Sequence, residues 1–303
     1  DLEGTRPMTT DLHFRIGSVA KLFAGTAVLR LADAARLDVD SPISRYVEGV
    51  PQGSRITLDM LGRHTSGLFN PIESRDFQAA IMTAPSRIWT DAEILADVVA
   101  RPPAFAAGTR WRYSNANTLL LAMAAERAAD ERWPDLLRRL VLDPLDLAAT
   151  GMTPAEGLPQ PAPRGYRYGR RDWPIGYGDV LSDATVFSAS WAGAAGNMHS
   201  TAADLARAAV PLASGALLSA AGRARLHDWQ PTGQRGERHG FHVFERDGRI
   251  GHAGDVPGFS AALAWDASTG TAVAALANLS NTPRAPAPAI ALVDAAFAAQ
   301  RPA

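Results

Sequence analysis

The sequence has no cysteine in its 303 residues, which excludes disulfide bonds, thiolate catalysis and zinc sites built on cysteine. It has no apolar run near the roughly 20 residues that a membrane-spanning helix needs. No block of five or more Lys and Arg residues occurs and the formal net charge is −1, so nothing favours nucleic acid as a partner. The seven histidines contain no His-x-x-x-His spacing, and we expect neither a metal nor another cofactor.

Lysine is almost absent as well, because Lys21 is the single lysine among 30 Lys and Arg residues. Arginine stays protonated in proteins, whereas a desolvated lysine can lose its proton and act as a base. Lys21 follows Ser18 by three residues, a spacing that puts both side chains on one face of a helix. The alternative interpretation is a serine N-cap with a surface lysine beside it. The positive end of the helix dipole disfavours a charged lysine there.

The apolar periodicity changes along the chain from that of helices to that of strands. Residues 18–37 have apolar side chains at helical spacing, and the Asp- and Pro-containing segment 38–42 ends that helix. Residues 151–190 are rich in Gly, Pro and aromatic residues and predict an irregular segment. Further helices are expected at 58–63, 91–99, 115–129, 133–142, 201–213 and about 288–299, and strands at 241–246, 248–253, 259–265 and 271–279.

This order predicts an α+β fold, in which an antiparallel β-sheet is flanked by helices and joined to a mostly helical lobe. We expect residues 38–195 to form the helical lobe. Residues 1–37 with 196–303 are expected to form the sheet-and-helix lobe. The whole chain, 1–303, would be a single catalytic unit.

Two further motifs raise the interest of Ser18 and Lys21. Tyr113-Ser-Asn115 leads into an expected helix, where a tyrosine can relay a proton and an asparagine amide can hold a substrate carbonyl. A packing tyrosine and a helix N-cap form the alternative. His252-Ala253-Gly254 lies on an expected strand, along which a substrate backbone can pair. Its alternative is an ordinary strand before a turn.

A second serine lies near a histidine, in the segment His64-Thr-Ser66-Gly67. A triad interpretation would make Ser66 the nucleophile. The segment follows an expected helix and leads into a loop, so we interpret it as a structural turn.

Taken in order, Ser-x-x-Lys, Tyr-x-Asn and His-x-Gly resemble the motifs of the serine β-lactamase and penicillin-binding protein family. That family includes class C β-lactamases, D-alanyl-D-alanine carboxypeptidases, and related esterases and D-aminopeptidases. Further landmarks of the resemblance are Phe14-Arg-Ile-Gly17, His64-Thr-Ser-Gly67 and Ser200-Thr-Ala-Ala-Asp204. A finer similarity to soluble, penicillin-sensitive D-alanyl-D-alanine carboxypeptidases lies in residues 190–196, 218–221 and 275–278.

The resemblance implies an acyl-enzyme mechanism and a small peptide, ester or β-lactam-like substrate. Ser18 would be the acylated nucleophile, and Lys21 and Tyr113 would share the proton transfers. Asn115 would orient the substrate amide. Only the resemblance favours a secreted or extracytoplasmic location.

The resemblance also implies how the substrate is flanked. His252, Ala253, Gly254 and Asp255 would line its binding edge. The backbone N–H of Ser18 and a strand N–H near Asp255 would form the oxyanion hole. Trp191 is either a wall of the pocket or a core tryptophan.

Two positions depart from the carboxypeptidase pattern, which commonly has hydroxyl residues where this chain has Ala253 and Asp255. A missing donor and an added carboxylate weaken the binding of a substrate carboxylate. A D-alanyl-D-alanine carboxypeptidase/transpeptidase stays the function that the motifs most resemble, and esterase, D-aminopeptidase, peptide-cyclising acyltransferase and class C-like β-lactamase are its alternatives. The rival from another class is an inactive relative that binds peptidoglycan fragments or β-lactams.

The second departure is at the front of the chain. The family normally has a helix and two strands before the segment with which this sequence begins, and these elements are expected to be absent from it. One edge of the strand at 271–279 would then lack its neighbour. We expect an upstream segment, a partner chain or a dimer contact to cover that edge.

Overall fold

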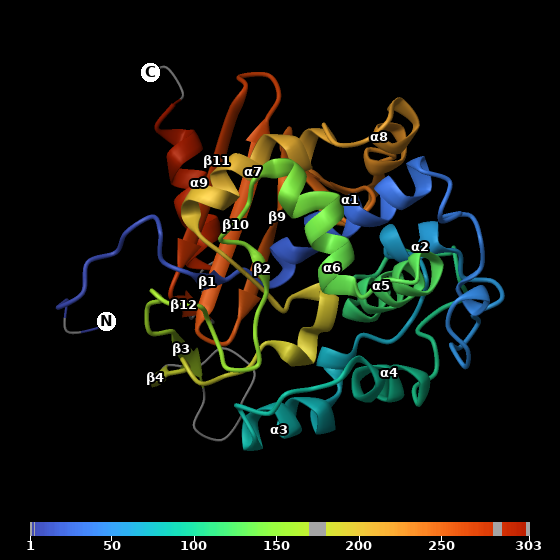
Figure 1. The fold of residues 1–303 in the computed structure, drawn as a ribbon, viewed down its shortest axis with the longest axis horizontal. Helices are drawn as coiled ribbons and strands as arrows, with labels where there is room; N and C mark the ends of the chain where they lie inside the picture. Colours follow the sequence, from blue (N-terminus) through green and yellow to red (C-terminus); the bar gives the residue numbers. More distant parts are fainter. Residues whose placement is uncertain (1, 3, 170–179, 281–286, 301–303) are drawn as a thin grey trace.

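A six-stranded antiparallel sheet organises the molecule, with strand order β11-β10-β9-β8-β7-β6 (Figure 1). The computed structural model describes residue 2 and residues 4–169, 180–280 and 287–300. The six strands are β6 (Gln230–Pro231), β7 (Glu237–His239), β8 (Phe244–Arg246), β9 (Arg249–Val256), β10 (Phe259–Asp266) and β11 (Thr271–Ala277). The predicted α+β class is confirmed, and so are the strands expected after residue 240, with small shifts at their ends.

Helices cover both faces of this sheet. Helix α9 (Pro288–Ala298) packs on one face, where Ala262 and Val273 point toward its buried Val293. Helices α1 (Ala20–Asp33) and α7 (Ala202–Ser214) pack on the other face, which carries Ala261 and Leu263. Successive side chains of a strand point to opposite faces of the sheet. Since helices cover both faces, the side chains on both are mostly apolar, and polar and apolar residues do not alternate along these strands.

The helix after Ser18 is buried on nearly all sides, including every residue from Ala20 to Leu29. It begins with a 3-10 turn at Gly17–Val19. It ends at Asp33, so the expected end at residue 37 was wrong. Ala35 takes a left-handed conformation (φ 54°), which turns the chain back so that Leu37 enters the core. Alanine favours helices, so the composition of residues 34–36 did not predict this turn.

The other helices lie mainly between this helix and the sheet in sequence: α2 (Leu58–Gly62), α3 (Arg75–Thr83), α4 (Asp91–Val99), α5 (Asn115–Ala129), α6 (Trp133–Leu137) and α8 (Ala220–Leu226). The bounds of α4 and α5 are those predicted. Their N-termini are capped by Thr90 and Ser114. The expected helix at 133–142 is confirmed as α6 followed by a π-helical turn, Arg138–Leu142.

Two small sheets complete the described fold. Strands β1 (Phe14–Arg15), β5 (Met198–Ser200) and β2 (Gly151–Met152) form one, and β12 (Leu279–Ser280), β3 (Tyr166–Gly169) and β4 (Val180–Asp183) form the other. The expectation of an irregular segment was therefore wrong at β3 and β4. These strands form through pairing with each other and with β12, more than a hundred residues away, which a local pattern does not reveal.

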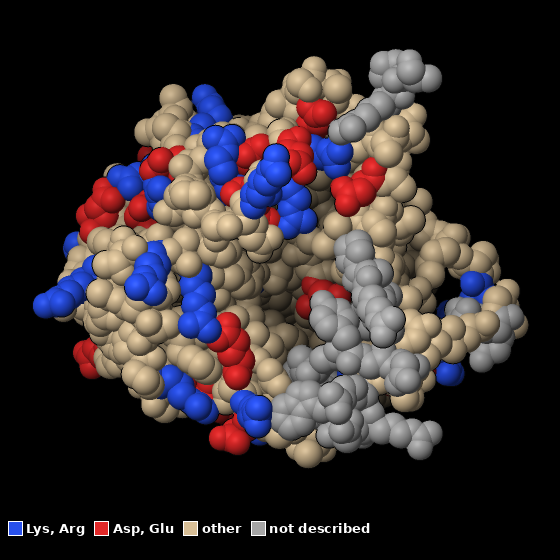
Figure 2. Space-filling view, turned by 180° about the vertical axis from the view of Figure 1, so that it is seen from behind, with Lys and Arg blue, Asp and Glu red and all other residues tan. Residues whose placement is uncertain are grey.

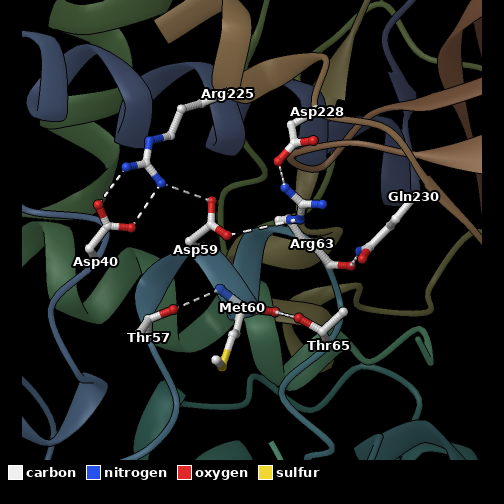
Figure 3. A network of polar contacts seen from close by, with 9 residues as sticks. All are labelled: Asp40, Thr57, Asp59, Met60, Arg63, Thr65, Arg225, Asp228 and Gln230. Atoms are coloured by element: carbon white, nitrogen blue, oxygen red, sulfur yellow. Dashed lines mark hydrogen bonds and ion pairs between the residues drawn. The ribbon is translucent and has the colours of Figure 1, made fainter. Parts of the chain in front are cut away.

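A network of ion pairs links α2 to α8 and to the segment before β6 (Figure 3). Arg225 of α8 contacts Asp40 and Asp59, and Arg63 contacts Asp59 and Asp228. Gln230 donates to the carbonyl oxygen of Arg63 at 2.5 Å. The network therefore joins Asp40 and helix α2 to residues 225–230, which lie far along the chain.

Strand β11 is the outer strand of the main sheet, and its residues are all half-buried. Among the described residues, no further strand pairs with its outer edge. What covers that edge stays a prediction. No helix in the described ranges is both long enough and apolar enough to span a bilayer.

Candidate active site

Ser18 and Lys21 come together as the helical spacing predicts. Ser18 lies in the 3-10 turn before α1, half-buried, and Lys21 lies in the first turn of α1 with no exposed surface. The Lys21 Nζ atom is 3.0 Å from Ser18 Oγ, 2.9 Å from Asn115 Oδ1 and 2.8 Å from the carbonyl oxygen of Ala195. The predicted pair is thus in direct contact.

The protonation state of Lys21 follows from its burial. Burial holds the pKa of Lys21 well below its ordinary value, because the charged form loses its hydration. A neutral amine has two N–H donors and one lone pair. The oxygens of Asn115 and Ala195 only accept, so they take both N–H groups. The lone pair is then left for the Ser18 hydroxyl, as a general base requires.

Tyr113 lies close to both Ser18 and Lys21. Its ring centroid is 4.9 Å from Lys21 Nζ. Burial raises the pKa of Tyr113, while its hydrogen bond with Ser18 acts in the opposite direction. The phenol therefore stays protonated and can hold or pass on a proton at the nucleophile.

The turn that carries Tyr113 and Asn115 is fixed by hydrogen bonds from two sides. Ser114 caps α5 by accepting from the Ala116 N–H, and its hydroxyl donates to the carbonyl oxygen of Phe69. The Asn115 N–H donates to Asn70 Oδ1 at 3.1 Å. Ser114 is thus the N-cap, and the Asn115 side chain is left to contact Lys21.

Four buried histidines stand behind Tyr113, and we refer to His64, His239, His242 and His252 as the histidine cluster. The ring centroid of His64 is 4.9 Å from that of His239, 5.1 Å from that of His242 and 4.5 Å from that of Tyr113. Burial lowers the pKa of each histidine, to about 3 for His252. The cluster is therefore neutral at ordinary pH.

Ser66 and His64 form no nucleophile–base pair. Ser66 is buried and donates to Asn117 Oδ1 at 2.6 Å, while it accepts from the Leu68 N–H. The Asn117 amide nitrogen is 2.7 Å from His64 Nδ1. The prediction of a structural turn is confirmed.

Strand β9 runs past Ser18 at very short range. A Cβ at Gly254 would lie 2.1 Å from the carbonyl oxygen of Ile16 and 2.6 Å from the Ser18 nitrogen. Only glycine allows this approach. Strand β8 pairs with β9 only from Arg249 to Gly251, so in the described part of the chain the edge from His252 onward faces the nucleophile without a paired strand.

A cavity of about 460 Å³ opens beside Ser18. His252 is buried, Ala253 is half-buried and Asp255 is exposed. The cavity walls include Ser18, Tyr113, His252, Ala253, Trp111 and Phe244. Seen from behind, the molecule is hollowed near its centre, and acidic and basic side chains are interspersed around the hollow (Figure 2).

Some residues of the site escaped the sequence interpretation. Trp111 and Phe244 line the cavity, and Ala195 holds Lys21 through its carbonyl oxygen. The one local signal was the place of Trp111, two residues before Tyr113. Trp191 is 8% exposed and packs in a core cluster with Ile94. It is not among the residues that line the cavity at Ser18.

The described ranges contain no candidate metal centre. No group of three or more His, Asp or Glu side chains is placed there to hold a metal ion.

The chain is similar in sequence and in fold to known proteins. Residues 1–297 match the family model described as beta-lactamase. The D-amino acid amidase from Ochrobactrum anthropi SV3 is 26% identical with a TM-score of 0.80, and the match covers 93% of this chain and 82% of that one. The D-stereospecific amidohydrolase from Streptomyces sp. is also 26% identical with a TM-score of 0.80, over 89% and 83%.

Two curated relatives give a similar result at lower coverage. The putative penicillin-binding protein PbpX of Bacillus subtilis is 25% identical over 279 residues, which are 91% of this chain and 63% of that protein. The esterase EstB of Burkholderia gladioli is 31% identical over 179 residues, which are 52% of this chain and 42% of that protein. The chain thus spans less than two thirds of the length of these relatives.

Proposed function

The chain belongs to the beta-lactamase family, and from this premise we propose that it is a serine hydrolase that cleaves amides or esters of D-amino acids through an acyl-enzyme at Ser18. The observation that carries the proposal is the buried Lys21 amine, which lies 3.0 Å from the Ser18 hydroxyl and is held there by Asn115 and the Ala195 carbonyl oxygen.

The proposed reaction begins when Lys21 takes the Ser18 proton and Oγ attacks the substrate carbonyl. In this proposal the N–H groups of Ser18 and Asp255 stabilise the oxyanion, and the close approach of Gly254 to the Ser18 backbone supports this role. Lys21 returns the proton through Tyr113 to the leaving amine or alkoxide. Water then attacks the acyl-enzyme, with the same groups removing its proton.

The walls of the cleft support a substrate without a free carboxylate at its leaving group. Ala253 offers a methyl group and no donor. The two arginines that line the cavity already contact carboxylates, Arg246 with Glu237 and Arg249 with Asp294 at 3.0 Å. A substrate carboxylate would have to displace one of these partners. The names of the amidase and amidohydrolase relatives support D-configured substrates.

The second candidate is a D-alanyl-D-alanine carboxypeptidase, which the finer motif similarity favours. Esterase EstB supports a simple ester as a further substrate of the same site. All of these reactions use Ser18 in the same way, and they differ in the group that leaves.

Kinetics with matched substrates test the proposal. We expect D-phenylalanine amide and its methyl ester to be hydrolysed with kcat/KM at least about tenfold above N-acetyl-D-alanyl-D-alanine, a difference that one unpaired buried charge can produce. Ser18→Ala should abolish both hydrolysis and fluorophosphonate labelling, while Ser66→Ala should retain labelling. Efficient release of D-alanine would favour the carboxypeptidase, and labelling of the Ser18→Ala variant would refute the site.

A further inference from the structure

Arg15 is a buried arginine that forms no ion pair with any described carboxylate. It is the second residue of β1 and only 4% exposed, although its place between Phe14 and Ile16 would suit an outward-facing charge. The loops at 153–164 and 185–189 cover it. In the described ranges, no carboxylate lies within ion-pair distance of its guanidinium, whereas Arg63, Arg225 and Arg246 all have such partners.

The contacts of Arg15 are few for a group with five N–H donors. One nitrogen donates to the carbonyl oxygen of Thr185 at 3.3 Å, and the guanidinium lies 5.4 Å from the ring centroid of Phe259. The Nε atom is buried and has no hydrogen-bond partner. Burial lowers the pKa of Arg15 to about 10, and no neighbouring charge counteracts it. Such a group is expected to have an anionic partner.

Arg15 lines a cavity that could supply one. The cavity has a volume of about 470 Å³ and shares no lining residue with the one at Ser18. Arg6 and Arg164 also line it, with Glu156 as the one carboxylate among its lining residues. Arg164 contacts Asp183 at 3.4 Å, so Arg15 and Arg6 are the cations left to face a ligand. The remaining wall has an apolar part, with Leu158, Pro163, Val186 and Ala189, beside the polar residues Ser86, Thr153, Gln160, Thr185 and Ser188.

We propose that this cavity is a second binding site, separate from the cleft at Ser18, for a carboxylate attached to a compact apolar body. The Arg15 guanidinium is its anion-binding group, because a planar fork of donors matches the two oxygens of a carboxylate. The apolar wall receives the body of the ligand. Because Arg15 is the buried cation of the site, we expect a ligand with a single negative charge.

The test uses benzoate as the probe and inorganic phosphate as the comparison, in calorimetry and thermal-shift measurements at constant ionic strength. We expect benzoate to bind the wild type and raise its Tm. Arg15→Met should weaken benzoate binding about tenfold or more, the loss expected for a charge-assisted contact. Binding that survives in Arg15→Met would overturn the assignment, and so would a wild type that binds phosphate but not benzoate, or neither.

A second pair of variants keeps the test decisive if Arg15→Met does not fold. Val186 is 66% exposed, lines the cavity and follows Thr185, which accepts from Arg15. Val186→Glu adds a competing carboxylate at the rim, while Val186→Gln is its neutral match. Benzoate should bind Val186→Gln about as tightly as the wild type, and Val186→Glu several-fold more weakly. Equal binding to both variants would contradict the site.

Discussion

In the proposed mechanism, Ser18 can react only when the Lys21 amine is deprotonated. Lys21 is buried, and its two acceptor-only partners leave it one lone pair for the nucleophile. Arginine has similar reach and keeps its charge, but it does not deprotonate in proteins. The chemistry therefore depends on lysine as such and not on positive charge.

We predict that Lys21→Arg lowers kcat/KM about 10²- to 10⁴-fold, the range expected for loss of general-base catalysis. Steady-state hydrolysis of D-phenylalanine methyl ester measures it, with thermal melting to verify that the variant folds. Arg36→Lys is the matched control, since it adds a lysine at an exposed position and should leave activity unchanged. A Lys21→Arg enzyme within about tenfold of the wild type would show that another group is the base.

At this scale, the sequence predicted the contact of Ser18 with Lys21 from helical spacing, and the motif order predicted the approach of Tyr113 and Asn115. It did not predict the Ala195 carbonyl oxygen that completes the lysine's contacts, because a backbone acceptor leaves no mark in the identity of its residue. The burial of Arg15 was equally hidden, since it depends on loops that are distant in sequence.

At the scale of elements, the site depends on how closely β9 approaches the turn before α1. Gly254 lies against the backbone of Ile16 and Ser18, and its replacement by any larger residue forces the two apart. Strand β9 can therefore lie this close to the turn before α1 only because Gly254 has no side chain.

We predict that Gly254→Ala costs about 1–3 kcal/mol in the free energy of unfolding, as overpacking does. It should also lower kcat/KM about 10²-fold, because the nucleophile and the strand move apart. Denaturant unfolding and ester hydrolysis measure the two effects. Gly270→Ala is the control: Gly270 has φ +72° and open space around it, so strain should lower stability without loss of activity. Wild-type activity in Gly254→Ala would refute the role of the close approach.

Elements with strong local signals were predicted well, and the others were not. Helices α4 and α5 have capping residues and clear apolar periods, and their bounds match. Strand β3 pairs with β12, far along the chain, and with β4, so neither β3 nor β4 was evident from its own residues. Helix α1 ends early because Ala35 turns the chain, although the sequence there favours helix.

At the scale of the whole molecule, the histidine cluster gathers side chains from three regions of the chain into one buried layer behind Tyr113. Burial lowers the pKa of all four histidines below the ordinary value of 6.5, as it stands in the unfolded chain. Below pH 6.5 the unfolded state therefore binds more protons than the folded state. Stability must fall as the pH falls below 6.5, toward the lowered folded-state values.

We predict that unfolding free energy decreases by about 1.4 kcal/mol per pH unit for each such histidine below pH 6.5. Denaturant titrations between neutral and mildly acidic pH measure this slope. His239→Gln should reduce the dependence of the unfolding free energy on pH by the contribution of one histidine. Phe244→Leu, a change at a neighbour that does not titrate, should leave the slope as it is. An unfolding free energy independent of pH below 6.5 would contradict the neutral cluster.

The single, buried lysine has a practical consequence for anyone who handles the protein. Amine-directed cross-linkers, dyes and coupling resins find no lysine on its surface, since the one side chain they could modify has no exposed area. The folded chain therefore cannot be labelled or immobilised through a lysine side chain. If such a reagent does modify a lysine, it has modified Lys21, and under the proposed mechanism we expect loss of activity.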